Sequence, residues 1–172
     1  MRKGSIQMPW AVSSGESEVL PFLYFNAWDQ KAYNVTGGTS SAGTNTRVLN
    51  QSETNITGAS LSSNQITLPA GTYIVNAQAP CYLGDHNNIY LEQDPDGTPS
   101  FPIFGENQYA AAGSGGYTTS RILNRKLTIT ESTVFELGHY ITTGKATDGL
   151  GSFSYNSNGV SIYAQISFIK IA

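Results

Sequence analysis

Hydrophobic and polar residues alternate along much of this chain with a period of two residues. The alternation is clearest near the C-terminus, where one set of positions is apolar and the set between them is polar or mixed: Val160, Ile162, Ala164, Ile166 and Phe168 against Ser161, Tyr163, Gln165 and Ser167. Successive side chains of a β-strand point to opposite faces of a sheet. The pattern therefore predicts a strand at 160–171 with one face in the core and a mixed face outside it.

Two further segments alternate in the same way. Their expected core faces are Tyr73, Val75, Ala77 and Ala79 in one segment and Phe135, Leu137, His139 and Ile141 in the other. The opposite faces carry Ile74, Asn76 and Gln78 in the first segment and Val134, Glu136, Gly138 and Tyr140 in the second. No segment keeps an apolar period of 3.6 residues, so we expect about ten strands and no helix. Besides these three, the expected strands include 22–28, 46–50, 65–68, 87–93, 118–129 and 151–159.

Turn signals separate these short runs. Loops rich in Gly, Ser and Thr follow several of them, and Asp94-Pro95-Asp96-Gly97 closes another. Many short antiparallel strands joined by such loops are typical of a sandwich. We therefore predict an all-β fold, an antiparallel β-sandwich of the jelly-roll type, for a single domain over residues 21–172.

The stretch Ile66–Tyr73, ITLPAGTY, interrupts one strand and begins another. Pro69 cannot donate a hydrogen bond to a sheet, so it belongs at a strand end or edge. Gly71 accepts backbone conformations that other residues avoid. The stretch therefore predicts a corner at which the chain crosses from one sheet to the other.

Residues 1–20 lack this periodicity, and Met8, Pro9 and Trp10 stand there among small polar residues. We interpret the segment as an arm that anchors the domain to a larger assembly. A leading strand or a frayed terminus is the alternative. The segment has no continuous apolar core of the signal-peptide kind, and no run is long enough to span a membrane.

Composition narrows the function classes. Charged residues make up 12% of the chain and the net charge is −3, while Ser, Thr, Asn and Gly are abundant. Such surfaces are common in extracellular β proteins and in parts of virus particles. Nucleic-acid binding is not expected, because phosphate affinity needs a basic stripe that the sequence lacks. With Cys81 as the single cysteine, the fold must depend on packing or oligomerisation rather than on an internal disulfide.

Candidate chemistry is sparse. The Asp94–Gly97 turn fits a type I turn better than a calcium loop, because Pro and Gly occupy the positions that such a turn favours. His86 and His139 lack metal-ligand spacing, and His139 lies on a predicted core face. No nucleophile elbow, phosphate loop or indicated carboxylate pair is present. We therefore expect no catalytic residues, no metal and no cofactor.

Tyrosines are the more informative residues. Tyr109 and Tyr117 lie in an expected loop region, and Tyr155 lies in the Gly- and Asn-rich segment 151–159; all three stand beside Gly, Ser and amide residues such as Asn156. Aromatic rings next to amides suit the recognition of sugars or protein epitopes. These four residues are therefore candidate ligand-facing positions. The alternative is that their rings pack between loops.

Six short motifs, in order, resemble a group of bacteriophage virion proteins and tail-fibre tips, and more distantly the globular heads of complement proteins, which share the jelly roll of the tumour necrosis factor family. The motifs are DQKAYNVTGGT (29–39), TRVLN (46–50), SNQITLPAGTY (63–73), APCYLGDH (79–86), FELGHY (135–140) and GVSIYAQISFIKI (159–171). The chain departs from the group after His86, where Asn87 and Asn88 replace a basic residue, and in its Gly/Ala-rich middle.

The resemblance implies a non-enzymatic homotrimer, made in the host cytoplasm and displayed on the virion. It would act as a tail-fibre or receptor-binding tip, or as a capsid decoration or head fibre. Its arm would bind another virion protein, and its loops a host-surface glycan or protein, without membrane insertion. A bacterial carbohydrate-binding module or lectin domain is the alternative.

The resemblance also suggests a trimer interface. In jelly-roll trimers of this family one sheet packs around the threefold axis. If the strands at 72–79, 134–142 and 160–171 share that sheet, their non-core faces would line the interface. The residues concerned are Ile74, Asn76, Gln78, Tyr140, Tyr163 and Gln165.

Overall fold

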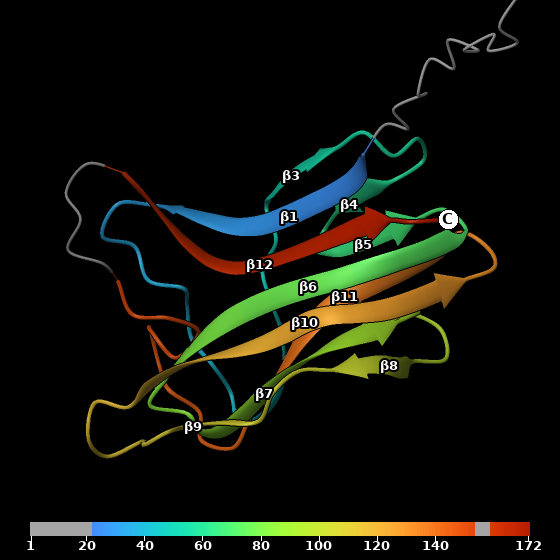
Figure 1. Cartoon of the computed structure of the whole chain (residues 1–172). Helices are drawn as coiled ribbons and strands as arrows, with labels where there is room; N and C mark the ends of the chain where they lie inside the picture. The colour runs from blue at the N-terminus through green and yellow to red at the C-terminus, as the bar shows by residue number, and fades with distance from the viewer. Residues whose placement is uncertain (1–21, 154–158) are drawn as a thin grey trace, which may run out of the picture.

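Two antiparallel β-sheets pack face to face in the computed structural model, which describes residues 22–153 and 159–172 (Figure 1). The first sheet has five strands in the order β10 (Tyr117–Ile129), β6 (Gly71–Tyr82), β12 (Val160–Lys170), β1 (Leu23–Ala32) and β3 (Gln51–Thr54). The anchor residues Met8, Pro9 and Trp10, and the loop residues Tyr155 and Asn156, lie outside the described residues.

The second sheet has seven strands. Its main order is β4 (Ser60–Ser62), β5 (Gln65–Leu68), β11 (Thr133–Ile141), β7 (Asp85–Gln93) and β8 (Ser100–Phe104), with β2 (Gly43–Thr46) paired to β11 and β9 (Gln108–Ala110) paired to β7. The predicted all-β antiparallel sandwich is confirmed. No helix in the described residues is long and apolar enough to cross a membrane.

The core lies between the sheets, where the alternation in β6 and β11 predicted it. Tyr73, Val75, Phe135 and Leu137 are all fully buried. Phe168 of β12 is the centre of an aromatic cluster, with ring centroids 6.2 Å from Phe25, 6.3 Å from Tyr73 and 6.2 Å from Phe135. Burying such rings supplies much of the stabilisation of a domain this size.

The predicted corner is present. Leu68 ends β5 in the seven-stranded sheet and Gly71 begins β6 in the five-stranded sheet. The Tyr73 hydroxyl donates a 2.6 Å hydrogen bond to the Pro69 carbonyl, which fixes the bend. A Cβ at Gly71 would come within 2.9 Å of the Ala172 carbonyl oxygen, so the close approach of the C-terminus requires glycine here.

The predicted face assignment fails in the first half of β12. Ala164, Ile166 and Phe168 are buried as predicted, but Val160 and Ile162 are exposed, and Ser161 and Tyr163 are buried instead. The pairing of β1 with β12 shifts register between Trp28 and Gln30. A β-bulge adds one residue to a strand, and every side chain beyond it changes face.

The predicted grouping of three strands in one sheet is wrong. β6 and β12 are neighbours in the five-stranded sheet, but β11 belongs to the seven-stranded sheet. Alternation shows which residues of a strand share a face, but it does not show which strands are neighbours. Tyr140 therefore lies on the opposite side of the molecule from Asn76 and Gln165.

Two of the predicted strands are largely irregular in the parts that the structure describes. Only Thr46 of the segment 46–50 lies in a strand, and residues 151–153 are irregular. Asparagine side chains replace sheet pairing near the first segment: Asn50 accepts a 2.9 Å hydrogen bond from the Gln30 amide, and Asn64 accepts one of 3.0 Å from the Leu49 amide. Such side-chain bonds compete with a ladder. The short strands β8 and β9 were not predicted.

The described chain enters and leaves at the same end of the sandwich (Figure 1). Leu23 at the start of β1 pairs with Lys170 at the end of β12, while Ala32 pairs with Val160 at the opposite end. We call that opposite end the distal end. It carries the loops that follow β1, β6, β9 and β11.

Candidate functional site

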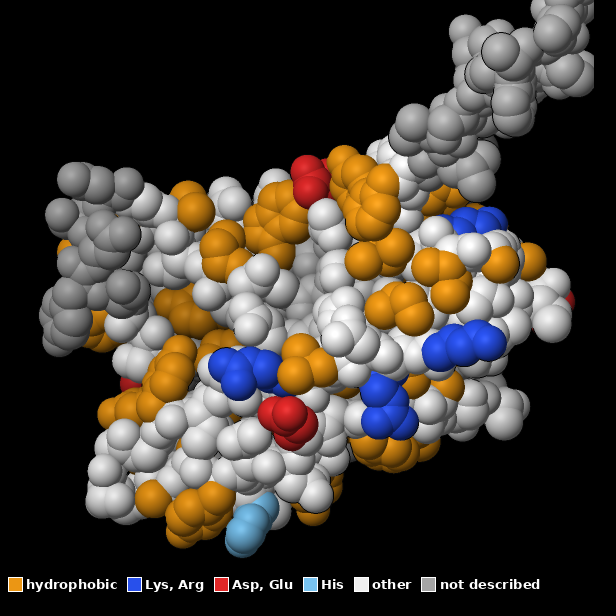
Figure 2. All heavy atoms as spheres, in the orientation of Figure 1, with side chains coloured by type: hydrophobic (Ala, Val, Ile, Leu, Met, Phe, Trp, Pro, Cys, Tyr) orange, Lys and Arg blue, Asp and Glu red, His pale blue; other side chains and the backbone are white. Residues whose placement is uncertain are grey.

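A hollow of about 400 Å³ lies on the outward face of the five-stranded sheet. Each strand of the sheet contributes to its lining: Asn26 and Trp28 from β1, Glu53 from β3, Asn76 and Gln78 from β6, Arg121 and Leu123 from β10, and Gln165 and Ser167 from β12. Figure 2 shows this face, with a depression of mostly white polar atoms at its centre. The lining combines side-chain amides with the charged Glu53 and Arg121 and the apolar Trp28 and Leu123.

Side-chain amides line much of the hollow, and only some of them have hydrogen-bond partners within the chain. Asn26 donates a 2.9 Å hydrogen bond to Glu53, and Asn76 accepts one of 2.9 Å from the Asn124 backbone amide. Gln78 and Gln165 stand opposite each other on β6 and β12. Within the described residues, neither of these two side-chain amides has a hydrogen-bond partner. They are free to bind groups supplied from outside.

The structure places the predicted interface residues in three different parts of the molecule. Ile74, Asn76, Gln78 and Gln165 lie on the outward face of the five-stranded sheet, as the prediction requires. Tyr163 is only 5% exposed and donates a 2.5 Å hydrogen bond to the Val35 carbonyl, so it packs inside its own chain. Tyr140 is 45% exposed on the outward face of the other sheet.

The prediction missed Trp28 and Leu123. Trp28 could have been found, because Phe25 and Ala27 are buried and the same alternation places Asn26 and Trp28 outside. Leu123 follows the buried Ile122 and is 54% exposed, on the opposite face of the strand, as the same alternation requires. The register of β10 against β6 shifts beyond Ile122, between that residue and Arg125, and this irregularity has no sequence signature as clear as an alternating pattern.

Two of the candidate tyrosines, Tyr109 in β9 and Tyr117 in β10, lie in strands rather than in the expected loops; both are at the distal end, but they do not come together. Tyr109 is 57% exposed, and its ring centroid lies 4.9 Å from that of His86, on the seven-stranded sheet. Tyr117 is 53% exposed and lies 6.3 Å from Tyr82, on the five-stranded sheet. The two rings therefore belong to two different surfaces.

Asp85 holds the loops beside Tyr109. Its carboxylate accepts a 2.7 Å hydrogen bond from the Thr143 hydroxyl and one of 2.8 Å from the Ala112 backbone amide. The Thr143 and Ala112 hydrogen bonds are the main reasons that the pKa of Asp85 is lowered. Through these two hydrogen bonds the carboxylate holds the loops that follow β9 and β11 in place.

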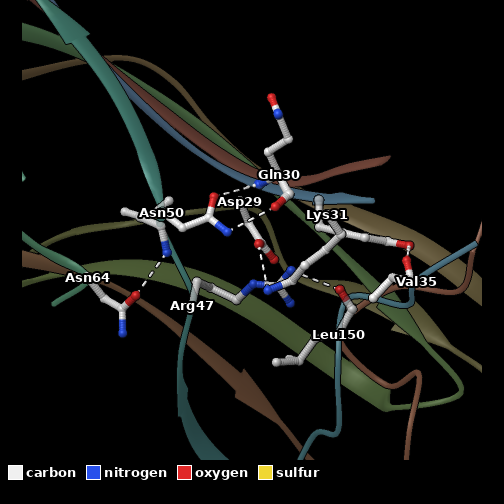
Figure 3. A network of polar contacts seen from close by, with 10 residues as sticks. Asp29, Gln30, Lys31, Val35, Arg47, Asn50, Asn64 and Leu150 are labelled. Carbon is white, nitrogen blue, oxygen red and sulfur yellow. Dashed lines mark hydrogen bonds and ion pairs between the residues drawn. The ribbon is translucent and has the colours of Figure 1, made fainter. Parts of the chain in front are cut away.

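Arg47 fixes the interior of the distal end (Figure 3). It is fully buried and donates hydrogen bonds to the Leu150 carbonyl at 2.8 Å and the Pro80 carbonyl at 3.3 Å. Burial lowers the pKa of Arg47 to about 10, and the attraction of Asp29 opposes that shift, so the guanidinium stays charged at neutral pH. Asp29 is itself 1% exposed and forms an ion pair with Lys31 at 3.0 Å.

His139 is the buried core histidine that the alternation predicted. Its Nε2 lies 3.1 Å from the Asn87 side-chain oxygen. Burial, followed by the charge of Arg47, lowers the pKa of His139 to about 3, so the ring is neutral in the folded protein at neutral pH. Burial likewise raises the pKa of the Cys81 thiol to about 11, which leaves it unreactive.

The described residues contain no group of three or more His, Cys, Asp or Glu side chains that could hold a metal ion. The predicted turn at Asp94–Gly97 is confirmed, because the Gly97 amide donates a 3.0 Å hydrogen bond to the Asp94 carbonyl.

The fold is similar to that of solved tumour necrosis factor-like proteins. Murine APRIL at pH 5.0 has a TM-score of 0.59 at 8% sequence identity, with 88% of this chain and 100% of that chain covered. Eiger TNF from S. frugiperda has a TM-score of 0.53 at 11% identity, with 89% and 94% covered.

Identities this low establish the fold alone: the chain is an all-β jelly roll of the tumour necrosis factor kind, as the resemblance implied. No protein-family model and no curated protein matches the sequence. The implied placement on a phage particle stays a prediction.

We expect His139 to make the protein less stable in acid. The unfolded chain takes up a proton near pH 6.5 while the folded chain resists it down to about pH 3. Stability should therefore fall as the pH drops through this window, by up to about 1.4 kcal/mol per pH unit from this group. Denaturant unfolding at a series of pH values would measure the slope.

The substitution His139→Gln keeps a hydrogen-bond donor for Asn87 but cannot titrate, so it should flatten the slope. His86→Gln is the matched control, because His86 is the other histidine and is exposed. Equal slopes in the native protein and His139→Gln would contradict the assignment.

Proposed function

We propose that this chain is a non-enzymatic, homotrimeric jelly-roll knob that a bacteriophage particle displays for adhesion to its host. The observation that carries the proposal is the hollow on the five-stranded sheet. It presents the half-exposed Leu123, the partly buried Trp28 and two unpartnered glutamine amides at the centre of a sheet. A surface of this kind is suited to a protein partner.

The partner that fits is a second copy of the chain. Glu53 and Arg121 lie on strands at opposite edges of the five-stranded sheet, so the hollow offers one charge of each sign across its width. A separate exposed surface exists at the edge strand β8, where Phe101 is 46% and Phe104 is 55% exposed. When two different patches of one chain bind each other, identical subunits form a closed ring if the rotation between them closes, as it does in a trimer.

Placement on a phage particle rests on the sequence. The six ordered motifs over residues 29–171 support it, and so does a surface rich in hydroxyl and amide groups. We propose that the chain is made in the host cytoplasm and fastened to the virion through residues 1–20, with the distal end facing outward. Three copies would multiply weak contacts with a cell surface.

The trimer can be tested by placing a charge in the hollow. The native protein should have a solution mass of about 55 kDa, three times the chain mass of 18.4 kDa. Gln165→Lys should give 18.4 kDa, because a lysine in each hollow would be buried without a partner on assembly. Light scattering measures both masses.

Asn88→Lys is the matched control for this experiment. It makes the same change in charge on the outward face of the other sheet, and the trimer should persist. A native monomer would contradict the trimer and favour the carbohydrate-binding module or lectin. Dissociation of the trimer in both variants would show that the hollow is not the contact between the subunits.

Deletion of residues 1–20 tests the arm. The shortened chain should keep its trimer mass and its melting temperature, but should no longer join particles when it is supplied to an assembling phage lacking its own copy. Immunoblotting of purified particles measures incorporation. Unfolding of the shortened chain would instead make the segment part of the core.

A further inference from the structure

The outward face of the seven-stranded sheet carries a row of exposed aromatic and amide side chains near the distal end. Pairing defines the row: Thr44 of β2 stands opposite Tyr140 of β11, which stands opposite Asn88 of β7. Two residues along β7, on the same face, His86 stands opposite Tyr109 of β9. We call these five residues the outer row.

Tyr140 and Tyr109 are the two large rings of the outer row, 45% and 57% exposed. The spacing of residues along a strand and of strands across a sheet places them roughly 12 Å apart. Between them lie the Asn88 amide and the His86 ring, whose centroid is 4.9 Å from that of Tyr109, with the two rings tilted by 53°. Two flat apolar surfaces thus flank groups that can donate and accept hydrogen bonds.

The outward surface of the sheet beside Tyr140 is flat because position 138 is glycine. Gly138 pairs with Tyr90, whose ring occupies the space that a side chain would take, so that a Cβ there would lie 2.2 Å from the ring. Tyr90 is 5% exposed and packs against Phe101 at 5.3 Å. No side chain therefore projects from position 138 beside Tyr140.

The charges of this sheet limit which ligands it can bind. None of its seven strands contains a lysine or arginine, whereas β1, β10 and β12 of the other sheet all do. Beyond Tyr90, Glu92 stands opposite Glu136, and burial followed by Glu136 raises the pKa of Glu92. A surface with carboxylates and without cations repels anions.

We propose that the outer row is a binding site for a neutral glycan, a short oligosaccharide of uncharged sugars. The apolar faces of two sugar rings would stack on Tyr140 and Tyr109. Their hydroxyl groups would bind the Asn88 amide, the Thr44 hydroxyl and the His86 ring nitrogens. The site lies on the sheet opposite the hollow, so assembly through the hollow leaves it open. This inference rests on the proposed function and names the ligand of the adhesive surface.

Binding of the full chain to an array of neutral oligosaccharides, with sialylated and phosphorylated counterparts alongside, tests the inference. We expect the chain to bind neutral oligosaccharides of the array, with an affinity that does not depend on the salt concentration. Tyr140→Ser and Tyr109→Ser should each weaken it roughly tenfold or more. Tyr117→Ser is the matched control, because Tyr117 is 53% exposed at the distal end but on the other sheet, and its effect should be under about twofold.

Melting curves and light scattering of each variant separate loss of the site from loss of the fold or the trimer. A correct trimer mass with no neutral glycan bound would overturn the inference while leaving the trimer intact. Preference for acidic glycans would overturn it as well, as would equal losses in Tyr140→Ser and Tyr117→Ser. A Glu92→Gln, Glu136→Gln double variant should bind as the native chain does, and loss of its binding would instead indicate a cationic protein partner.

Discussion

The buried guanidinium of Arg47 is the constraint on which the distal end depends. A buried charge is costly unless hydrogen bonds and a counter-charge compensate it. Arg47 meets this demand with the carbonyls of Pro80 and Leu150 and the nearby carboxylate of Asp29. It thereby joins β6 and the loop after β11 to the segment that follows β2. Burial is the main reason that His139 stays neutral, and the charge of Arg47 adds to it, so this side chain contributes both to the position of the loops and to the electrostatics of the core.

The alternation of apolar and polar residues and the turn residues predicted the features that depend on neighbouring positions along the chain. The core faces of β6 and β11 followed from alternation, and the corner between β5 and β6 followed from Pro69 and Gly71. The pattern could not reveal the bulge that turns Tyr163 inward, because an extra residue in a strand leaves the composition unchanged. Nor could it assign β11 to its sheet, since neighbours are chosen by packing across the core. The structure places Gln78 and Gln165 on the outward face of the five-stranded sheet, as predicted, but it places Tyr140 on the other sheet and Tyr163 inside its own chain. The trimer interface itself stays a prediction.

In the proposed function the two sheets have different roles. The five-stranded sheet carries Lys31, Arg121 and Lys170 among its cations and has a hollow lined with amides. The seven-stranded sheet has no cation in its strands and has an aromatic row near the distal end. One face is suited to a second copy of the chain and the other to a ligand from outside. The proposed division accounts for the large exposed rings on both sides of a sandwich with few charged residues.

Oxidative footprinting of the purified native protein tests this division most directly. Leu123 and Tyr140 are similarly exposed in the single chain, at 54% and 45%, but they lie on different sheets. The account predicts that Leu123 and Trp28 are protected from hydroxyl radicals, while Tyr140 and Tyr109 are labelled. Labelling of Leu123 together with protection of Tyr140 would show that the copies cover the outer row instead, and would contradict the account.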